Sequence, residues 1–187
     1  MAREVIPSGA ALGADVRGID FSQPLSADDK TFIQKAWKDH LVLRFKGQSL
    51  EDEDLIRMAD DFGGSQVAGS RQYYLNAGYD AKSGRVSHLP GITLISNLGK
   101  DGKPEKSNSG TGSNELIWHT DNSYVENPPK GSILYGIQVP INGGGDTSFV
   151  NQYETYDALS EPMKKRLLTL HIRHDNSRNT AGGTRPT

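Results

Sequence analysis

The sequence predicts a mainly β protein with flanking helices (α+β), in which an antiparallel jelly roll packs against helices of the N-terminal part. Two observations support this fold class. The N-terminal part carries two segments whose apolar residues recur at helical spacing, and many short strand-like segments separated by Gly- and Pro-containing turns follow it. Short strands that follow a helical region are typical of a β-sandwich or barrel with helices outside it.

Composition indicates one domain, residues 1–187. This length allows a hydrophobic core and is too short to argue for two domains. Charged residues make up 24% of the chain and balance to a net charge of −2 without a basic run, so neither nucleic acid nor a membrane is an expected partner. The absence of cysteine excludes disulfides and thiolate sites. Since the chain has no signal-like or membrane-length apolar run, we expect a cytoplasmic protein.

Residues 1–63 are predicted to form a scaffold of strands and helices. Ser26 can cap a helix, because a serine oxygen accepts hydrogen bonds from the free amides of the first turn, and acidic residues follow it there. The expected elements are one or two strands in Val5–Ile19, a helix after Ser26, a buried strand at Leu41–Phe45 and a helix from about Ser49 to Phe62.

The rest of the chain is divided into lid-like loops over 64–114 and metal-binding jelly-roll strands over 115–187. A long polar loop before a metal-binding strand is typical of a functional lid, although disorder is the alternative. Strands are expected at Gly91–Asn97, Ser132–Val139, Asp146–Val150 and Leu170–His174, and a helix from Ser160 to Leu168.

The pair His119 and Asp121 is the main candidate for chemistry. Residues two apart on a strand project from the same face, so the imidazole and the carboxylate can both bind one divalent metal ion. With a second histidine they would complete the two-His-one-carboxylate site of non-haem Fe(II) oxygenases. The alternative is a surface strand in which polar residues alternate by chance.

The surrounding residues strengthen the metal interpretation. The run from Glu115 to Tyr135, then Val139-Pro140, Gly144-Gly145-Asp146-Thr147, Asn151 and Tyr156–Leu159, resembles the taurine dioxygenase (TauD/TfdA) family. The resemblance is specific over about residues 115–170, and the segment Gly9–Asp20 is similar to the family's opening more loosely.

The resemblance implies an enzyme with a double-stranded β-helix (cupin-like jelly roll). Such enzymes use Fe(II), O2 and 2-oxoglutarate to hydroxylate a small, anionic or amino-acid-like organic molecule, and release succinate and CO2. His119 and Asp121 then correspond to iron ligands, and Thr147 to the threonine that helps to bind the distal carboxylate of 2-oxoglutarate. Taken alone, Thr147 is better explained as a β-branched residue that starts a strand after a Gly-rich turn.

Part of the family pattern is missing from this sequence. In the family, the second histidine ligand and the arginine that binds 2-oxoglutarate lie well beyond the helix that ends near Leu168, and nothing here matches them. His171 and His174 follow that helix too closely. We therefore expect an incomplete jelly roll, and a chain that is inactive alone; a decayed relative is the alternative. The other unsuitable histidines and arginines are His40, His88, Arg173, Arg178 and Arg185.

Glu115 is a further candidate, for substrate binding. On an alternating strand it shares the face of His119, where its carboxylate would pair with an ammonium or guanidinium group. The alternative is a solvated glutamate at the end of a loop. The substrate itself and the oligomeric state are not determined by the sequence, and a homo-oligomer is compatible with it.

Two other classes of protein use similar residues. One is a redox-inert zinc-dependent hydrolase, because histidine and carboxylate also bind Zn²⁺. The other is a non-catalytic jelly-roll binding module or fragment. The presence of Asp121 argues against a halogenase of this superfamily, in which that carboxylate is lost.

Overall fold

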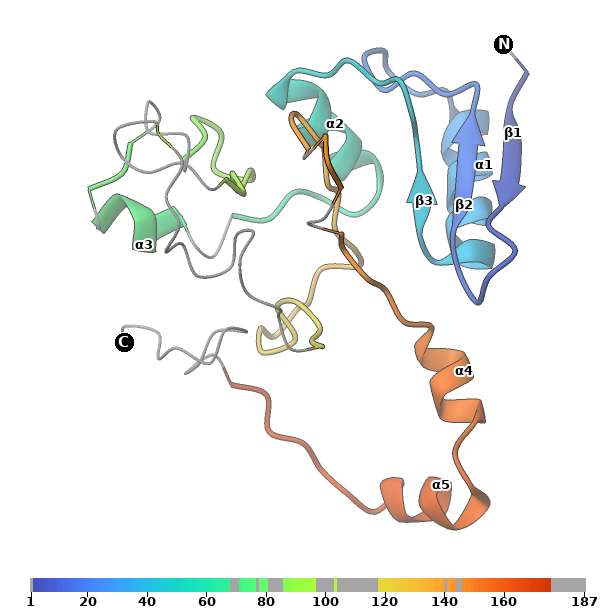
Figure 1. Ribbon diagram of the computed structural model, residues 1–187. Helices are drawn as coiled ribbons and strands as arrows, with labels where there is room; N and C mark the ends of the chain where they lie inside the picture. The colour runs from blue at the N-terminus through green and yellow to red at the C-terminus, as the bar shows by residue number, and fades with distance from the viewer. Residues whose placement is uncertain are drawn as a thin grey trace. The chain divides into compact units, whose positions relative to one another are not determined.

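The computed structural model describes residues 2–67, 71–76, 78–80, 86–96, 103, 118–139, 141–143 and 146–175. In chain order its elements are β1 (Glu4–Pro7), β2 (Ala14–Arg17), α1 (Ala27–His40), β3 (Leu43–Arg44), α2 (Asp52–Asp61), α3 (Arg71–Asn76), α4 (Gln152–Asp157) and α5 (Glu161–Leu167) (Figure 1). The chain divides into two compact units. The sheet unit comprises Met1–Phe62 with Gln138–Ile172, and the loop unit comprises Gly63–Ile137 with Arg173–Thr187.

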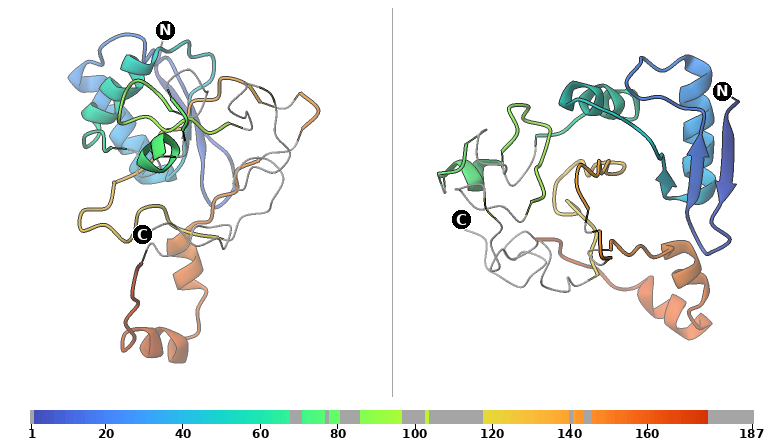
Figure 2. Two further views of the ribbon diagram at one scale, coloured as in Figure 1. Left: turned by 90° about the vertical axis from the view of Figure 1, so that its left-hand side faces the viewer. Right: turned by 45° about the horizontal axis from the view of Figure 1, so that its top comes forward.

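The sheet unit is built on three short strands in the order β1-β2-β3. β1 and β2 are antiparallel, with Val5 opposite Val16, and β3 is parallel to β2. α1 lies along one face of this sheet (Figures 1 and 2). The buried core connects the sheet, the loop after β2 and the helix α1, because Val16, Ile19 and Phe21 pack with Ile33 of α1. This mixed sheet with helices is the part of the predicted fold class that the structure confirms.

α1 forms where its end signals predict it. Ser26 accepts a hydrogen bond from the Asp29 amide, and the Asp29 carboxylate accepts one from the Ser26 amide, so both ends of a capping box are present. Ile33 and Ala36 are buried on the face toward the sheet. The helix ends at Leu41, whose φ of 65° is left-handed, and Trp37 holds this end because its indole Nε1 donates to the Leu41 carbonyl.

Within the sheet unit, α2 packs Met58 against the core and is also held by polar side chains. Its Arg57 donates to the Phe21 carbonyl at 2.7 Å, and the Lys30 ammonium of α1 pairs with Asp61 at 2.5 Å. Just before the helix, Gln48 accepts from the Phe21 amide and donates to the Ile19 carbonyl, both at 3.0 Å. These bonds satisfy backbone groups of the 19–21 segment that have no strand partner, as buried backbone requires.

None of the four strands predicted beyond residue 90 is formed within the described residues, so the jelly roll itself stays a prediction. The described parts of Gly91–Asn97, Ser132–Val139, Asp146–Val150 and Leu170–His174 contain no strand; the first of them has an isolated bridge between Val86 and Thr93. The reason is visible in the exposure of the apolar side chains: Leu134, Ile137 and Val139 are 62%, 81% and 70% exposed. A strand needs a partner for its backbone and a buried face for its side chains. Within the described residues this segment has neither.

Helices therefore outweigh strands among the described residues. α5 begins after Ser160, whose Oγ accepts from the Met163 amide, and confirms the predicted helix. The predicted strand at Leu41–Phe45 is shorter, β3, and its residues are at most half-buried. α3 and α4 were not expected. For α4 the sequence does contain a capping signal, because Asn151 is a residue type favoured at the N-cap and its side chain accepts from the first amides of the helix.

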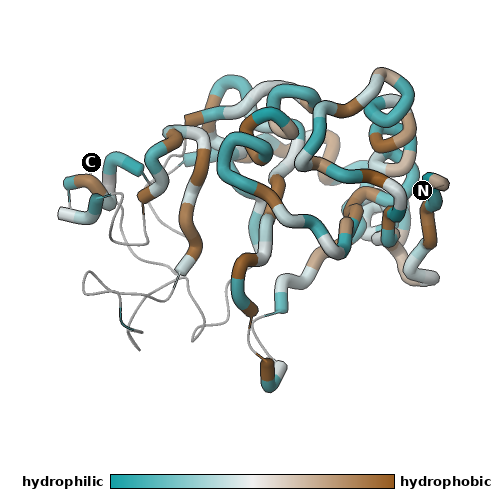
Figure 3. Tube along the Cα trace, turned by 90° about the horizontal axis from the view of Figure 1, so that it is seen from above, coloured by the Kyte–Doolittle hydropathy of each residue, from teal (hydrophilic) through white to brown (hydrophobic). Residues whose placement is uncertain are grey.

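Apolar and polar residues alternate at short intervals along the chain (Figure 3). In the part of the chain that the structure describes, no helix has both the length and the apolar character that a membrane span needs.

Asp15 of β2 is the most strongly perturbed carboxyl of the sheet unit. Arg44 of β3 donates to it at 2.6 Å and the Lys46 ammonium lies 3.1 Å away. These partners, Arg44 first, lower the pKa of Asp15 from its ordinary value of 3.8 to about 2. Asp15 is partly buried, but the Arg44 and Lys46 side chains are exposed, so salt will weaken these pairs.

We predict that Asp15→Asn removes an acid-sensitive contribution to stability. Because the folded-state pKa lies below the unfolded one, this contribution is complete above about pH 4 and disappears as the pH falls toward 2. Circular dichroism melts of wild type should thus lose melting temperature over this pH window more steeply than melts of Asp15→Asn. The exposed Asp146→Asn serves as control, and identical pH profiles for wild type and Asp15→Asn would contradict the assignment.

Candidate functional site

His119 and Asp121 lie in a turn of the loop unit, residues 118–124, and not on a strand. The described residues 118–120 have no regular structure, and residues 121–124 form a turn that the Val125 amide closes by donating to the Asn122 carbonyl at 3.2 Å. Asn122 has a φ of 52°. This left-handed conformation, which asparagine tolerates better than most residues, turns the chain out of an extended path just after Asp121. The predicted strand is therefore wrong at this position.

The predicted proximity of the two side chains is nevertheless confirmed. His119 Nε2 and Asp121 Oδ1 are 3.3 Å apart, and the two side chains are 35% and 68% exposed. Two donors bound at right angles to one metal ion, each about 2.1 Å from it, are about 3.0 Å apart. The imidazole nitrogen and the carboxylate oxygen thus have the spacing and the accessibility that neighbouring ligands of a first-row divalent metal need.

The described residues supply two such donors and not three. Among them no group of three or more His, Asp or Glu side chains is close enough to hold a metal ion. His40 lies at the end of α1, where its carbonyl accepts hydrogen bonds from the Gly13 and Val42 amides. Arg178 and Arg185 lie outside the described residues. The donor chemistry therefore fits Fe(II), with the protein ligand set incomplete within the described part.

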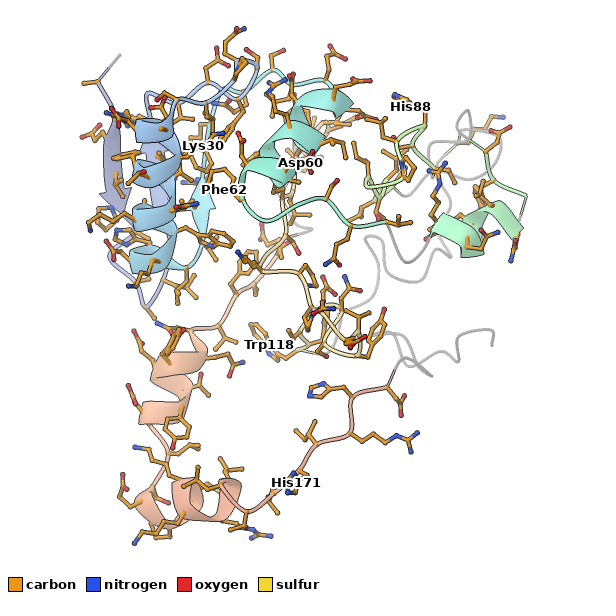
Figure 4. All side chains as sticks on the ribbon, turned by 180° about the vertical axis from the view of Figure 1, so that it is seen from behind. Lys30, Asp60, Phe62, His88, Trp118 and His171 are labelled. Atoms are coloured by element: carbon orange, nitrogen blue, oxygen red, sulfur yellow. The ribbon has the colours of Figure 1, made fainter. Side chains whose placement is uncertain are left out.

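Trp118 and His174 flank the pair within the loop unit. Trp118, adjacent to His119, is 66% exposed (Figure 4), so it is not the core residue that its apolar character suggests. His174 Nδ1 lies 3.0 Å from Ser123 Oγ, two positions beyond Asp121. No local pattern predicts this contact, because 51 residues separate its partners.

Of the other two predicted site residues, Thr147 and Glu115, the structure describes only Thr147. Thr147 is exposed in the sheet unit, on an irregular segment that leads into α4. Glu115 lies outside the described residues. The 2-oxoglutarate role of Thr147 and the substrate role of Glu115 both stay predictions.

Asn151 fixes the C-terminal end of the irregular segment 146–150, which contains Thr147. Its Oδ1 accepts from the Tyr153 amide at 3.0 Å and caps α4, while its Nδ2 donates to the Ala11 carbonyl at 2.8 Å. One side chain thus attaches α4 to the loop between β1 and β2.

A shallow surface depression of about 580 Å³ on the sheet unit is the alternative site. It is lined by Arg3, Asp28, Thr31 and Phe32. Arg3 pairs with Asp29 at 3.1 Å and lies over the Phe32 ring, so its charge is already engaged within the protein. We therefore place the candidate site at the turn of residues 118–124.

Comparison with known proteins identifies the class. Residues 4–187 match the family described as "Taurine catabolism dioxygenase TauD, TfdA family", so the chain belongs to this family. It is 32% identical over 171 residues to pentalenolactone F synthase of Streptomyces avermitilis, a match that covers 89% of this chain and 50% of that protein.

Two further relatives are named for the cosubstrate. The alpha-ketoglutarate-dependent 2,4-dichlorophenoxyacetate dioxygenase of Cupriavidus pinatubonensis is 30% identical over 186 residues, covering 95% of this chain and 61% of that protein. The alpha-ketoglutarate-dependent sulfate ester dioxygenase of Pseudomonas putida is 30% identical over 174 residues, covering 92% and 50%. The chain thus spans about half the length of the curated relatives it matches.

We predict that Asn151→Ala lowers the free energy of unfolding by about 1–2 kcal/mol, because it removes both a helix cap and a hydrogen bond to Ala11. Asn151→Asp keeps the capping oxygen and loses only the donor, so it should lose less. Urea unfolding followed by circular dichroism measures both variants. Equal losses for the two would show that the cap contributes nothing.

Proposed function

We propose that this protein, in its complete form, is an Fe(II)- and 2-oxoglutarate-dependent dioxygenase. The 3.3 Å approach of His119 Nε2 to Asp121 Oδ1 carries the proposal, because it presents two suitable ligands from one turn in a chain of the TauD/TfdA family. When bound, iron and 2-oxoglutarate would supply the chemistry by which O2 is reduced: one oxygen atom enters succinate as 2-oxoglutarate loses CO2, and the other enters the substrate. We propose His119 and Asp121 as two of the iron ligands.

The chain's own residues hold and orient these groups. The segment around Asp121 holds both donor atoms within 3.3 Å of one another, and the exposure of both side chains leaves them accessible to metal and cosubstrate. The Thr147 hydroxyl is proposed to donate a hydrogen bond to the distal carboxylate of 2-oxoglutarate. We further infer that the complete fold is the double-stranded β-helix of the family, in which segments such as 132–139 find partner strands.

The substrate class we propose is a small organic anion. Two relatives are named for a phenoxyacetate and for sulfate esters, both of which carry a negative charge. Glu115 is proposed at the substrate side, where its carboxylate would favour an ammonium-bearing acid over one without an amine.

Asp121→Ala should abolish metal binding by the turn while leaving the fold intact, because it removes a ligand and no buried group. Isothermal titration with Mn(II), a redox-stable substitute for Fe(II), measures the loss, and circular dichroism checks the fold. Glu126→Ala, which removes an exposed carboxylate of the same segment, is the matched control and should bind like wild type. Unchanged Mn(II) affinity in Asp121→Ala would defeat the assignment.

In the complete protein, anaerobic addition of Fe(II) and 2-oxoglutarate should give a weak visible charge-transfer band, which neither a zinc hydrolase nor a binding module gives. In Thr147→Val, which keeps the shape and loses the hydroxyl, half-saturation should need about tenfold more 2-oxoglutarate, since a hydrogen bond to a charged group contributes about 1.5 kcal/mol or more. Ser148→Ala is the control. A band with unchanged saturation in Thr147→Val would remove this residue from the site, and no band in the complete wild-type protein would contradict the oxygenase.

A further inference from the structure

His174 makes a long-range contact with the turn that carries His119 and Asp121. Its Nδ1 lies 3.0 Å from Ser123 Oγ, at hydrogen-bond distance, and either tautomer allows one of the two groups to donate. Both residues belong to the loop unit, which the chain re-enters at Arg173 after the 138–172 segment. Because the two residues are 51 positions apart, this contact ties the turn to a distant part of the chain, whereas bonds within the turn connect only neighbouring residues.

Two bonds of the turn are local: the Val125 amide donates to the Asn122 carbonyl, and the Tyr124 hydroxyl donates to the Asn122 side chain, each at 3.2 Å. Asn122 is in the left-handed region, which asparagine tolerates less well than glycine does. Trp118 at the start of the turn is mostly exposed, so apolar burial contributes little there.

We infer that His174 is a positioning residue, whose imidazole holds Ser123 and thereby fixes the turn so that His119 and Asp121 converge on one metal ion. The inference rests on the proposed function, because it assumes that these two side chains bind metal. Residues that orient metal ligands from outside the first coordination sphere change affinity by about 10- to 100-fold when mutated.

The contacting atom suggests a variant that should rescue the loss. Nδ1 is two bonds from Cβ, and so are the amide oxygen and nitrogen of asparagine, whereas those of glutamine are one bond farther. His174→Asn can therefore keep the hydrogen bond to Ser123, while His174→Ala and His174→Gln lose it. His171→Ala is the matched control, because His171 is an exposed histidine three residues earlier that belongs to the sheet unit.

The first test measures hydrogen–deuterium exchange of residues 119–125 in the full chain without metal. His174→Ala and Ser123→Ala should each exchange about tenfold faster than wild type, and the double variant no faster than either, since both remove one bond. His174→Asn and His171→Ala should match wild type. Wild-type exchange in His174→Ala, or failure of His174→Asn to restore protection, overturns the inference.

The second test measures Mn(II) affinity by calorimetry in the same variants. His174→Ala should bind about tenfold more weakly than wild type, and His174→Asn should recover most of this loss. If wild type and Asp121→Ala bind Mn(II) equally or not at all, the proposed function fails, and with it the metal-positioning role. If Asp121→Ala loses binding but His174→Ala retains it, the proposed function stands and the positioning role is overturned, even where exchange has accelerated.

Discussion

The pairing of β1 with β2 and of β2 with β3 is the interaction on which the sheet unit depends. It holds Val16 toward α1, and the chain after β2 then brings Ile19 and Phe21 into the same core, where the Phe21 ring meets Phe45 edge to face at 4.8 Å between ring centres. Strands of two to four residues have too few side chains to be stable singly, so each one forms only together with its neighbour. The same constraint explains why apolar residues 132–139 remain without strand structure.

Local signals predicted local structure well. The helices after Ser26 and Ser160 begin at serines whose side chains accept a hydrogen bond from the amide three residues later. Both partners of such a bond lie in the same short stretch of sequence, so a local pattern is enough to predict it. The strands beyond residue 90 failed as predictions for the opposite reason. Alternating apolar residues show that a segment could be a strand. Whether it becomes one depends on pairing with a strand that is distant in sequence, and a local pattern contains no information on that partner.

The candidate site shows both sides of this limit. A spacing of two residues correctly predicted that His119 and Asp121 approach one another, but through the wrong geometry, since a left-handed residue at Asn122 now sets the local path. His174 follows α5 too closely to match the family's distal ligand, and its contact with Ser123 is of a different kind, since it joins two side chains that no local pattern connects.

The bond from Asn151 to the Ala11 carbonyl joins residues 140 positions apart, and this separation sets an order of events during synthesis. Closing a loop of that length costs about 4 kcal/mol of chain entropy, more than one hydrogen bond returns. The strands and α1 have all their partners within the first 62 residues and can form while the ribosome is still extending the chain. Asn151 then arrives at a finished surface, and attaching α4 to it is a late step of folding.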